Sequence, residues 1–127
     1  MYLFYESEEI FMKKLTMYAL LATSSLLASH SALAAGDKDK GKQLFQICAN
    51  CHGEKARGNS DTKAPQLAGQ YDWYLITQLK NFKAGIRGSD PKDINGATMR
   101  PMAMTLADDQ AIEDVVAYIT SMKPVKH

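Results

Sequence analysis

The 127-residue chain contains only two cysteines and three histidines, and this scarcity limits the metal and redox sites that it can form. A structural zinc site needs four ligands, which usually include a second pair of Cys or His residues. The two histidines outside the cysteine region, His30 and His127, lie in an apparent targeting segment and at the last position. A thioredoxin-type site is also disfavoured, because no strand-rich βαβ pattern surrounds the cysteines.

The chain also lacks an apolar run of the ~20 residues that a membrane-spanning helix requires. Its apolar stretch, from Leu15 to about Ala28, follows Lys13-Lys14 and precedes Ala32-Leu33-Ala34. A basic start, a short apolar middle and a small-residue end are typical of a cleavable secretory signal. Residues 12–34 are therefore predicted to be a signal peptide. No cysteine lies near the cleavage site, so lipid attachment is not indicated.

Strong net charge is absent as well. Three glutamates in residues 1–11 oppose the positive start that a signal peptide uses, so we expect translation to begin at Met12 and residues 1–11 to be a misassigned extension. The mature domain, residues 35–127, then carries 13 basic and 11 acidic side chains. This near neutrality indicates neither nucleic acid nor an anionic membrane as a partner.

Both cysteines belong to one run, Cys48-Ala49-Asn50-Cys51-His52. Residues three apart on a helix lie side by side, so the two thiols would face one flat partner, and His52 follows directly. This C-x-x-C-H spacing is typical of c-type haem attachment, with thioether bonds from Cys48 and Cys51 and with His52 as the proximal iron ligand. The sequence therefore predicts one covalently bound haem c. The haem would also stabilise the domain, because about 90 residues bury only a small hydrophobic core of their own.

The hydrophobic pattern predicts an all-α domain with three principal helices and long loops. The first helix starts near Gly41 and ends at Gly53, and the last runs from about Asp108 to Met122. The second has Asp72 as its expected N-cap and is closed by Gly85. Residues 54–70 and 85–98 are rich in glycine, proline, asparagine and aspartate, which predicts loops.

A second axial ligand would decide what a bound haem does. With His52 alone, the iron would keep an open position suited to ligand binding or peroxidase chemistry, whereas a sixth ligand would make an electron carrier. A methionine thioether opposite a histidine raises the reduction potential. Met99, Met102 and Met104 precede the last helix, and their spacing does not choose among them. Methionines also commonly fill gaps in a core.

Several short motifs occur in order along residues 36–123 and surround Cys-x-x-Cys-His-Gly. They are Gly41-Lys42, Leu44-Phe45, Pro65-x-Leu67-Ala68-Gly69-Gln70, Tyr74-Leu75, Gln78-Leu79, Phe82-Lys83-x-Gly85-x-Arg87, Met99-Arg100, Leu106-x-Asp108 and Ala117-Tyr118-Ile119. With these motifs the chain resembles class I cytochromes c. It is especially similar to the single domains of small bacterial periplasmic cytochromes, including each half of the dihaem ones.

The resemblance implies the cytochrome c fold and roles for particular residues. Met99, which opens the Met-Arg run, would be the second axial ligand of the haem iron. The Pro65 carbonyl would accept a hydrogen bond from the free ring nitrogen of His52, which would orient the imidazole and keep it basic. Gly41 and Phe45 would cross the last helix near Val115 and Tyr118. Relatives often carry a serine cap at position 107, which is alanine here, so Asp108 or Thr105 would cap the last helix instead.

The resemblance also implies a function: a periplasmic one-electron carrier rather than an enzyme. Its donor would be a quinol-oxidising complex, and its acceptor a terminal oxidase or reductase. The first alternative is a haem-bearing subunit of a periplasmic redox enzyme. The second is a haem sensor or peroxidase with an open iron site. For docking, we expect an apolar patch within residues 98–105 with a basic rim of Lys80, Lys83, Arg87 and Arg100. Its methionines could equally face inward and fill gaps.

Overall fold

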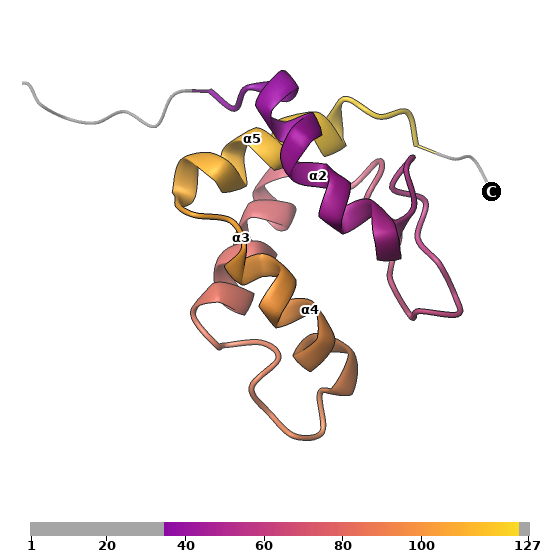
Figure 1. Ribbon diagram of the computed structural model, residues 1–127, viewed down its shortest axis with the longest axis vertical. Coiled ribbons are helices and arrows are strands. Elements are labelled where there is room, and N and C mark those ends of the chain that lie inside the picture. The colour runs from indigo at the N-terminus through magenta and orange to yellow at the C-terminus, as the bar shows by residue number, and fades with distance from the viewer. Residues whose placement is uncertain (1–34, 125–127) are drawn as a thin grey trace, which may run out of the picture. The chain divides into compact units, whose positions relative to one another are not determined.

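The computed structural model describes residues 35–124, all within the compact unit Leu33–His127. The expected extension (1–11), the expected signal peptide (12–34) and the last three residues of the expected domain lie outside the described residues. The described part contains four helices, α2 (Lys38–His52), α3 (Asp72–Lys83), α4 (Ile94–Met104) and α5 (Asp109–Thr120) (Figure 1). None of these helices is long and apolar enough to cross a membrane.

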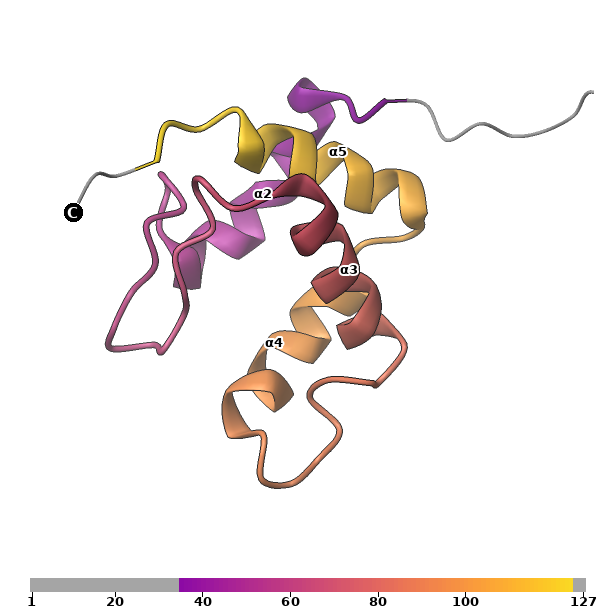
Figure 2. The ribbon, with the colours of Figure 1, turned by 180° about the vertical axis from the view of Figure 1, so that it is seen from behind.

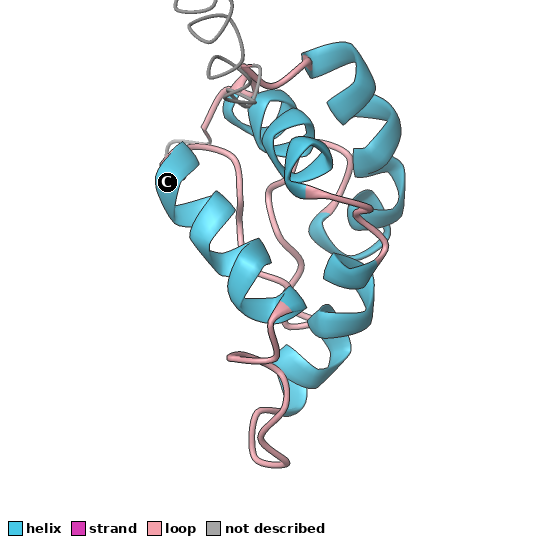
Figure 3. Cartoon of the chain, turned by 90° about the vertical axis from the view of Figure 1, so that its left-hand side faces the viewer, coloured by secondary structure: helices cyan, strands magenta, loops and turns pink. Residues whose placement is uncertain are grey.

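The all-α prediction is confirmed, and residues 35–124 contain one helix beyond the three principal helices expected. Residues 35–124 contain no strand, only an isolated antiparallel bridge between Asn59 and Ala64. Long loops join the helices (Figure 3). The helix beyond the expected three is α4, which begins inside the predicted loop 85–98 and includes Met99. Asp93 caps it by accepting a hydrogen bond from the Gly96 N–H at 2.9 Å.

Two helix starts also differ from the prediction. α2 begins at Lys38 because the Asp37 carboxylate accepts hydrogen bonds from the N–H groups of Asp39 and Lys40, at 2.9 and 3.2 Å. Its first turn is polar, so the hydrophobic pattern does not mark it. Asp72 is the first residue of α3 and not its N-cap. Its negative charge still suits the positive end of the helix dipole.

The start of α5 settles a choice left open by the sequence. Asp108 is the N-cap, and its carboxylate accepts a hydrogen bond from the Ala111 N–H at 2.8 Å. The helix then buries one apolar face, whose four core side chains are at most 3% exposed: Ile112, Val115, Val116 and Ile119. This face anchors the hydrophobic core of the domain.

α2 and α5 cross in close contact, as the resemblance implies (Figures 1 and 2). Gly41 is buried at the crossing, where a Cβ would overlap the Asp114 carbonyl oxygen and lie 2.9 Å from the Tyr118 Cβ. One turn later, the rings of Phe45 and Tyr118 pack at a centroid distance of 5.5 Å and an angle of 59°. Glycine at position 41 is therefore required by the short distance between the helices.

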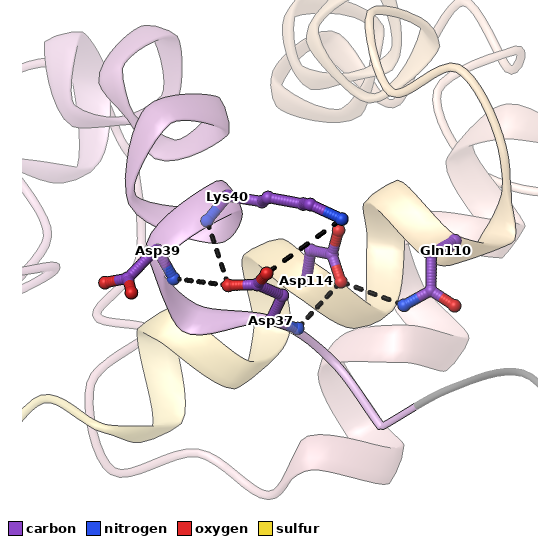
Figure 4. Close-up of polar contacts among 5 residues, drawn as sticks. All are labelled: Asp37, Asp39, Lys40, Gln110 and Asp114. Carbon is purple, nitrogen blue, oxygen red and sulfur yellow. Dashed lines mark hydrogen bonds and ion pairs between the residues drawn. The ribbon is translucent and has the colours of Figure 1, made fainter.

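A buried carboxylate fastens the start of α2 to α5 (Figure 4). Asp114 is 4% exposed and accepts hydrogen bonds from the Asp37 N–H at 2.8 Å and from the Gln110 side chain at 2.9 Å. Lys40 Nζ lies 3.9 Å from the Asp37 carboxylate. The hydrogen bond from the Asp37 N–H, the main cause, lowers the pKa of Asp114. The carboxylate is thus charged at neutral pH although it is buried.

Candidate functional site

The last turn of α2 brings Cys48, Cys51 and His52 together at one wall of a cavity of about 400 Å³. This volume lies within the ~300–1,000 Å³ typical of cofactor pockets. The other walls are largely apolar side chains from the loop before α3, from α3 and from α5: Leu67, Leu75, Leu79, Phe82, Val115 and Ile119. A cysteine pair at the edge of an apolar cavity suits a large, flat, apolar cofactor attached through two thioether bonds.

His52 is held in one tautomer by the backbone. The residue is 5% exposed, and its Nδ1 lies 2.8 Å from the Pro65 carbonyl oxygen. A carbonyl can only accept, so Nδ1 donates the hydrogen and Nε2 keeps the lone pair that a metal needs. Burial lowers the pKa of His52 more than the bond to Pro65 raises it. The imidazole is therefore neutral at neutral pH, which is the ligand form.

Cys48 lacks the lowered pKa of a redox-active thiol. Burial raises the pKa of Cys48, an effect to which the neighbouring Cys51 adds. The Cys48 Sγ has only a weak contact, at 3.9 Å, with the Leu44 carbonyl oxygen. A reactive cysteine needs a lowered pKa, so the thioredoxin-type alternative is disfavoured here. Within residues 35–124, no three His, Cys, Asp or Glu side chains are grouped to hold a metal ion, which also disfavours zinc.

The three candidate methionines are placed differently. Met99 and Met102 lie one turn apart on α4 and both line the cavity. Met104, at the end of α4, is 55% exposed and is not part of the cavity wall. The structure thus puts two thioethers on the same cavity as His52. The assignment of Met99 as the iron ligand stays a prediction.

The expected docking patch at residues 98–105 is only partly on the surface. Ala103 is 1% exposed and belongs to the core, and Met102 is half-buried and faces the cavity. Pro101 and Met104 are exposed. An apolar patch there would therefore be narrow, and Met102 agrees with the alternative in which methionines fill gaps.

Three of the four expected rim cations have partners of their own. Lys80 pairs with Asp109 at 2.8 Å, and Lys83 donates to the Leu106 carbonyl oxygen. Arg87 donates to the Gln78 side chain at 2.7 Å and lies over the Phe82 ring, 4.4 Å from its centroid. These cations connect elements of the fold more than they form a free basic surface.

Sequence reasoning missed the polar part of the cavity wall, which includes Thr62, Gln78, Arg87, Asp93, Asn95 and Thr98. The sequence contained a signal for two of these residues, Gln78 and Arg87, because both lie in motifs that carry the family resemblance. Asn95 and Thr98 gave none, since Asn95-Gly96 resembles a loop breaker.

Comparisons with known proteins agree with this geometry. Residues 38–123 match the family model described as Cytochrome c. Cytochrome c4 from Stutzerimonas stutzeri is 37% identical over 94 residues, which are 72% of this chain and 44% of that protein. Cytochrome c-554(548) from Halomonas halodenitrificans is 36% identical over 89 residues, 70% of this chain and 100% of that protein.

A solved structure is similar as well. The crystal structure of reduced recombinant cytochrome c4 from Pseudomonas stutzeri aligns with a TM-score of 0.56 and 35% identity, over 70% of this chain and 47% of that one. The chain spans about half the length of the cytochrome c4 relatives that it matches.

Proposed function

Because the chain belongs to the cytochrome c family, we propose that it carries single electrons between redox proteins. It is a class I c-type cytochrome similar to one domain of the dihaem cytochromes, and it has one covalently bound haem c. The observation that carries the proposal is the placement of Cys48, Cys51 and His52 in one helical turn at an apolar cavity that Met99 also lines.

Each of these side chains has a distinct task in the proposal. Cys48 and Cys51 hold the cofactor covalently, so that it stays bound in both redox states. His52 Nε2 and the Met99 thioether would bind the haem iron, and the Pro65 carbonyl orients the imidazole. When bound, haem c supplies an iron that changes its oxidation state by one electron. The apolar side chains around the cavity exclude water and so favour the less charged, reduced state.

The proposal includes a location and partners. We place the mature protein in the bacterial periplasm after export through the predicted signal peptide. There it would accept electrons from a quinol-oxidising complex and pass them to a terminal oxidase or reductase, with no bond chemistry on a substrate. Such exchanges need contacts that form and separate quickly, which is typical of small interfaces.

The absorption spectrum of the purified holoprotein tests the ligand assignment. We expect low-spin iron with the weak band of a thioether–iron bond. Met99→Ala should abolish this band and lower the potential, because a methionine ligand raises the potential. Met102→Ala and Met104→Ala are the matched controls and should keep both. Loss of the band in Met102→Ala alone would transfer the role to Met102. High-spin wild-type iron that binds carbon monoxide readily would favour the open-site alternative.

A further inference from the structure

The loop that follows α2 returns to His52 at two points. The Gly58 N–H donates to the His52 backbone carbonyl at 2.9 Å, and His52 Nδ1 donates to the Pro65 carbonyl at 2.8 Å. Between these points, Asn59 and Ala64 form an antiparallel bridge with hydrogen bonds of 2.9 and 3.0 Å. The chain therefore closes a ring that begins at the His52 backbone and ends at the His52 side chain.

Gly58 fits tightly against the peptide that presents the Pro65 carbonyl. Its φ is +80°, a conformation that favours glycine. A Cβ at this position would lie 2.8 Å from the Pro65 carbonyl carbon, 2.8 Å from the Ala64 oxygen and 2.7 Å from the Gln66 nitrogen. No atom of Gly58 touches the cavity. Any side chain here would push directly on the acceptor of the His52 hydrogen bond.

The segment beyond Pro65 is held separately. The N–H groups of Leu67 and Ala68 both donate to the Ala56 carbonyl, at 2.9 and 3.0 Å, and Ala56 is fully buried. A push at Gly58 therefore cannot be relieved by moving the whole loop as one body. The displacement falls on the peptide between Ala64 and Gln66.

We propose that Gly58 and the Asn59–Ala64 bridge, called here the His52 clamp, are positioning elements that tune the reduction potential through the His52–Pro65 hydrogen bond. This inference rests on the proposed function, because it requires His52 to be an iron ligand. A ring that donates a strong hydrogen bond from Nδ1 is a more basic ligand at Nε2. A more basic ligand favours the oxidised, more positive iron, so the clamp holds the potential down and loosening it raises the potential.

The geometry indicates how far a variant would loosen the clamp. Ordinary contact with a Cβ begins at 3.4 Å, so the Pro65 peptide must move by about 0.6 Å to admit a methyl group at position 58. A displacement of this size along the hydrogen bond would stretch it from 2.8 Å to about 3.4 Å. That is beyond the usual range of N–H···O bonds.

The test compares Gly58→Ala with Gly53→Ala in the holoprotein. Gly53 also has a positive φ, +78°, but nothing lies within 4 Å of a Cβ there, so only the strain is shared. Outer partners of a metal ligand typically change metal affinity 10–100-fold. The His52–Pro65 hydrogen bond in Gly58→Ala is weakened rather than removed. We therefore expect the equilibrium constant between the oxidised and reduced states to shift by up to tenfold away from the oxidised state. For one electron this is a rise in potential of up to about 59 mV. The reduction potential of Gly53→Ala should shift much less.

The sign of the shift separates the clamp from general damage. A pocket that merely opens to water stabilises the more charged, oxidised state and lowers the potential. A second readout is solvent exchange of the His52 Nδ1 proton, followed by NMR in the reduced protein. We expect it to be faster in Gly58→Ala than in Gly53→Ala. An unchanged exchange rate, a lowered potential, or equal shifts in the two variants would overturn the proposal.

Asn59→Ala gives a milder version of the test. The Asn59 side chain accepts a hydrogen bond from the Asp61 N–H at 2.8 Å inside the turn of the bridge, and it does not line the cavity. We expect a smaller rise in potential, and its absence would contradict the clamp even if Gly58→Ala failed to retain haem. A wild-type protein without low-spin, histidine-ligated haem would refute the proposed function. If the wild-type spectrum is normal but the variants do not show these shifts in potential, only the clamp is refuted.

Discussion

Replacement of Gly41 by alanine would disturb the crossing of α2 and α5 at its tightest point. A Cβ would lie 2.6 Å from the Asp114 carbonyl carbon and 2.9 Å from the Tyr118 Cβ. Both neighbours belong to a helix, so the clash cannot be relieved by rotating a flexible side chain. To bring the Asp114 carbonyl carbon to ordinary contact at 3.4 Å, the helices must separate by at least about 0.8 Å, and the carbonyl oxygen, which is nearer still, requires more.

The expected loss of stability follows from this separation. A gap of ~0.5–1 Å forfeits about a quarter to a half of the dispersion energy of each contact that it opens. Overpacked sites typically lose ~1–3 kcal/mol and occasionally more, and a clash with backbone belongs at the upper end. The better helix propensity of alanine offsets about 1 kcal/mol. We expect a net loss of about 2 kcal/mol, or roughly 8–16 °C in the midpoint for a domain of this size.

Denaturant unfolding of the holoprotein measures this loss, and Gly36→Ala is the matched control. A Cβ at position 36 would clash in the same way, 2.6 Å from the Glu113 carbonyl carbon and 2.8 Å from the Ala117 Cβ. Gly36, however, precedes α2, so it can shift without separating the two helices, and the shift weakens only the hydrogen bond from the Asp37 N–H to Asp114. We expect a loss of about 1 kcal/mol, half of that for Gly41→Ala. Equal losses in the two variants, or a Gly41→Ala protein as stable as the wild type, would refute the reasoning.

Two further predictions concern covalent attachment and the buried carboxylate. Cys48→Ala or Cys51→Ala should lose most of its covalently bound haem on a denaturing gel stained for haem, and the haem-free chain should lose cooperative unfolding. A haem-free variant that unfolds as sharply as the wild type would contradict this. Asp114→Asn exchanges two charge-assisted hydrogen bonds for neutral ones and should lose about 2 kcal/mol at pH 7. Because the pKa of Asp114 is lowered in the folded protein, its stabilisation is complete above about pH 4 and is lost as the pH falls further. The difference in unfolding free energy between wild type and Asp114→Asn should therefore shrink in acid. A difference that does not depend on pH would exclude the carboxylate as its source.

The parts of the fold that the sequence predicts are those in which one local pattern decides the structure. α5 has apolar residues at 112, 115, 116 and 119, and this spacing by itself defines a helix with one buried face. The Cys48–His52 run predicts chemistry because two thiols and an imidazole in one turn suit few other partners. By contrast, the contact between His52 and Pro65 joins residues 13 apart through a loop. No periodic pattern predicts such a contact, and only the family resemblance suggested it.

α4 escaped prediction because its capping carboxylate and its packing against α3 outweigh its weak intrinsic helix preference. Its sequence contains Asn95-Gly96 and Pro101, which normally interrupt helices. In the structure, Asp93 accepts hydrogen bonds from the Gly96 N–H at 2.9 Å and from the Gly88 N–H at 3.1 Å. This one carboxylate thus caps the helix and fastens the preceding loop to it. Asp72 was misplaced by one residue for a simpler reason, since aspartate suits both the N-cap and the first turn.

The helical conformation of α4 also bears on the choice between the two methionines of the cavity. Met99 and Met102 are three residues apart, so they share a face and differ by about 4.5 Å in height along the axis. For Met102 to replace Met99 at the same iron, α4 would have to slide by nearly a full turn. The two Asp93 hydrogen bonds resist such sliding at one end. Arg100, which packs against Gly85 and Gly88, resists it near the middle. Met99→Ala is therefore expected to lose its thioether ligand rather than to recruit Met102, and this makes the single substitution a clean test of the assignment.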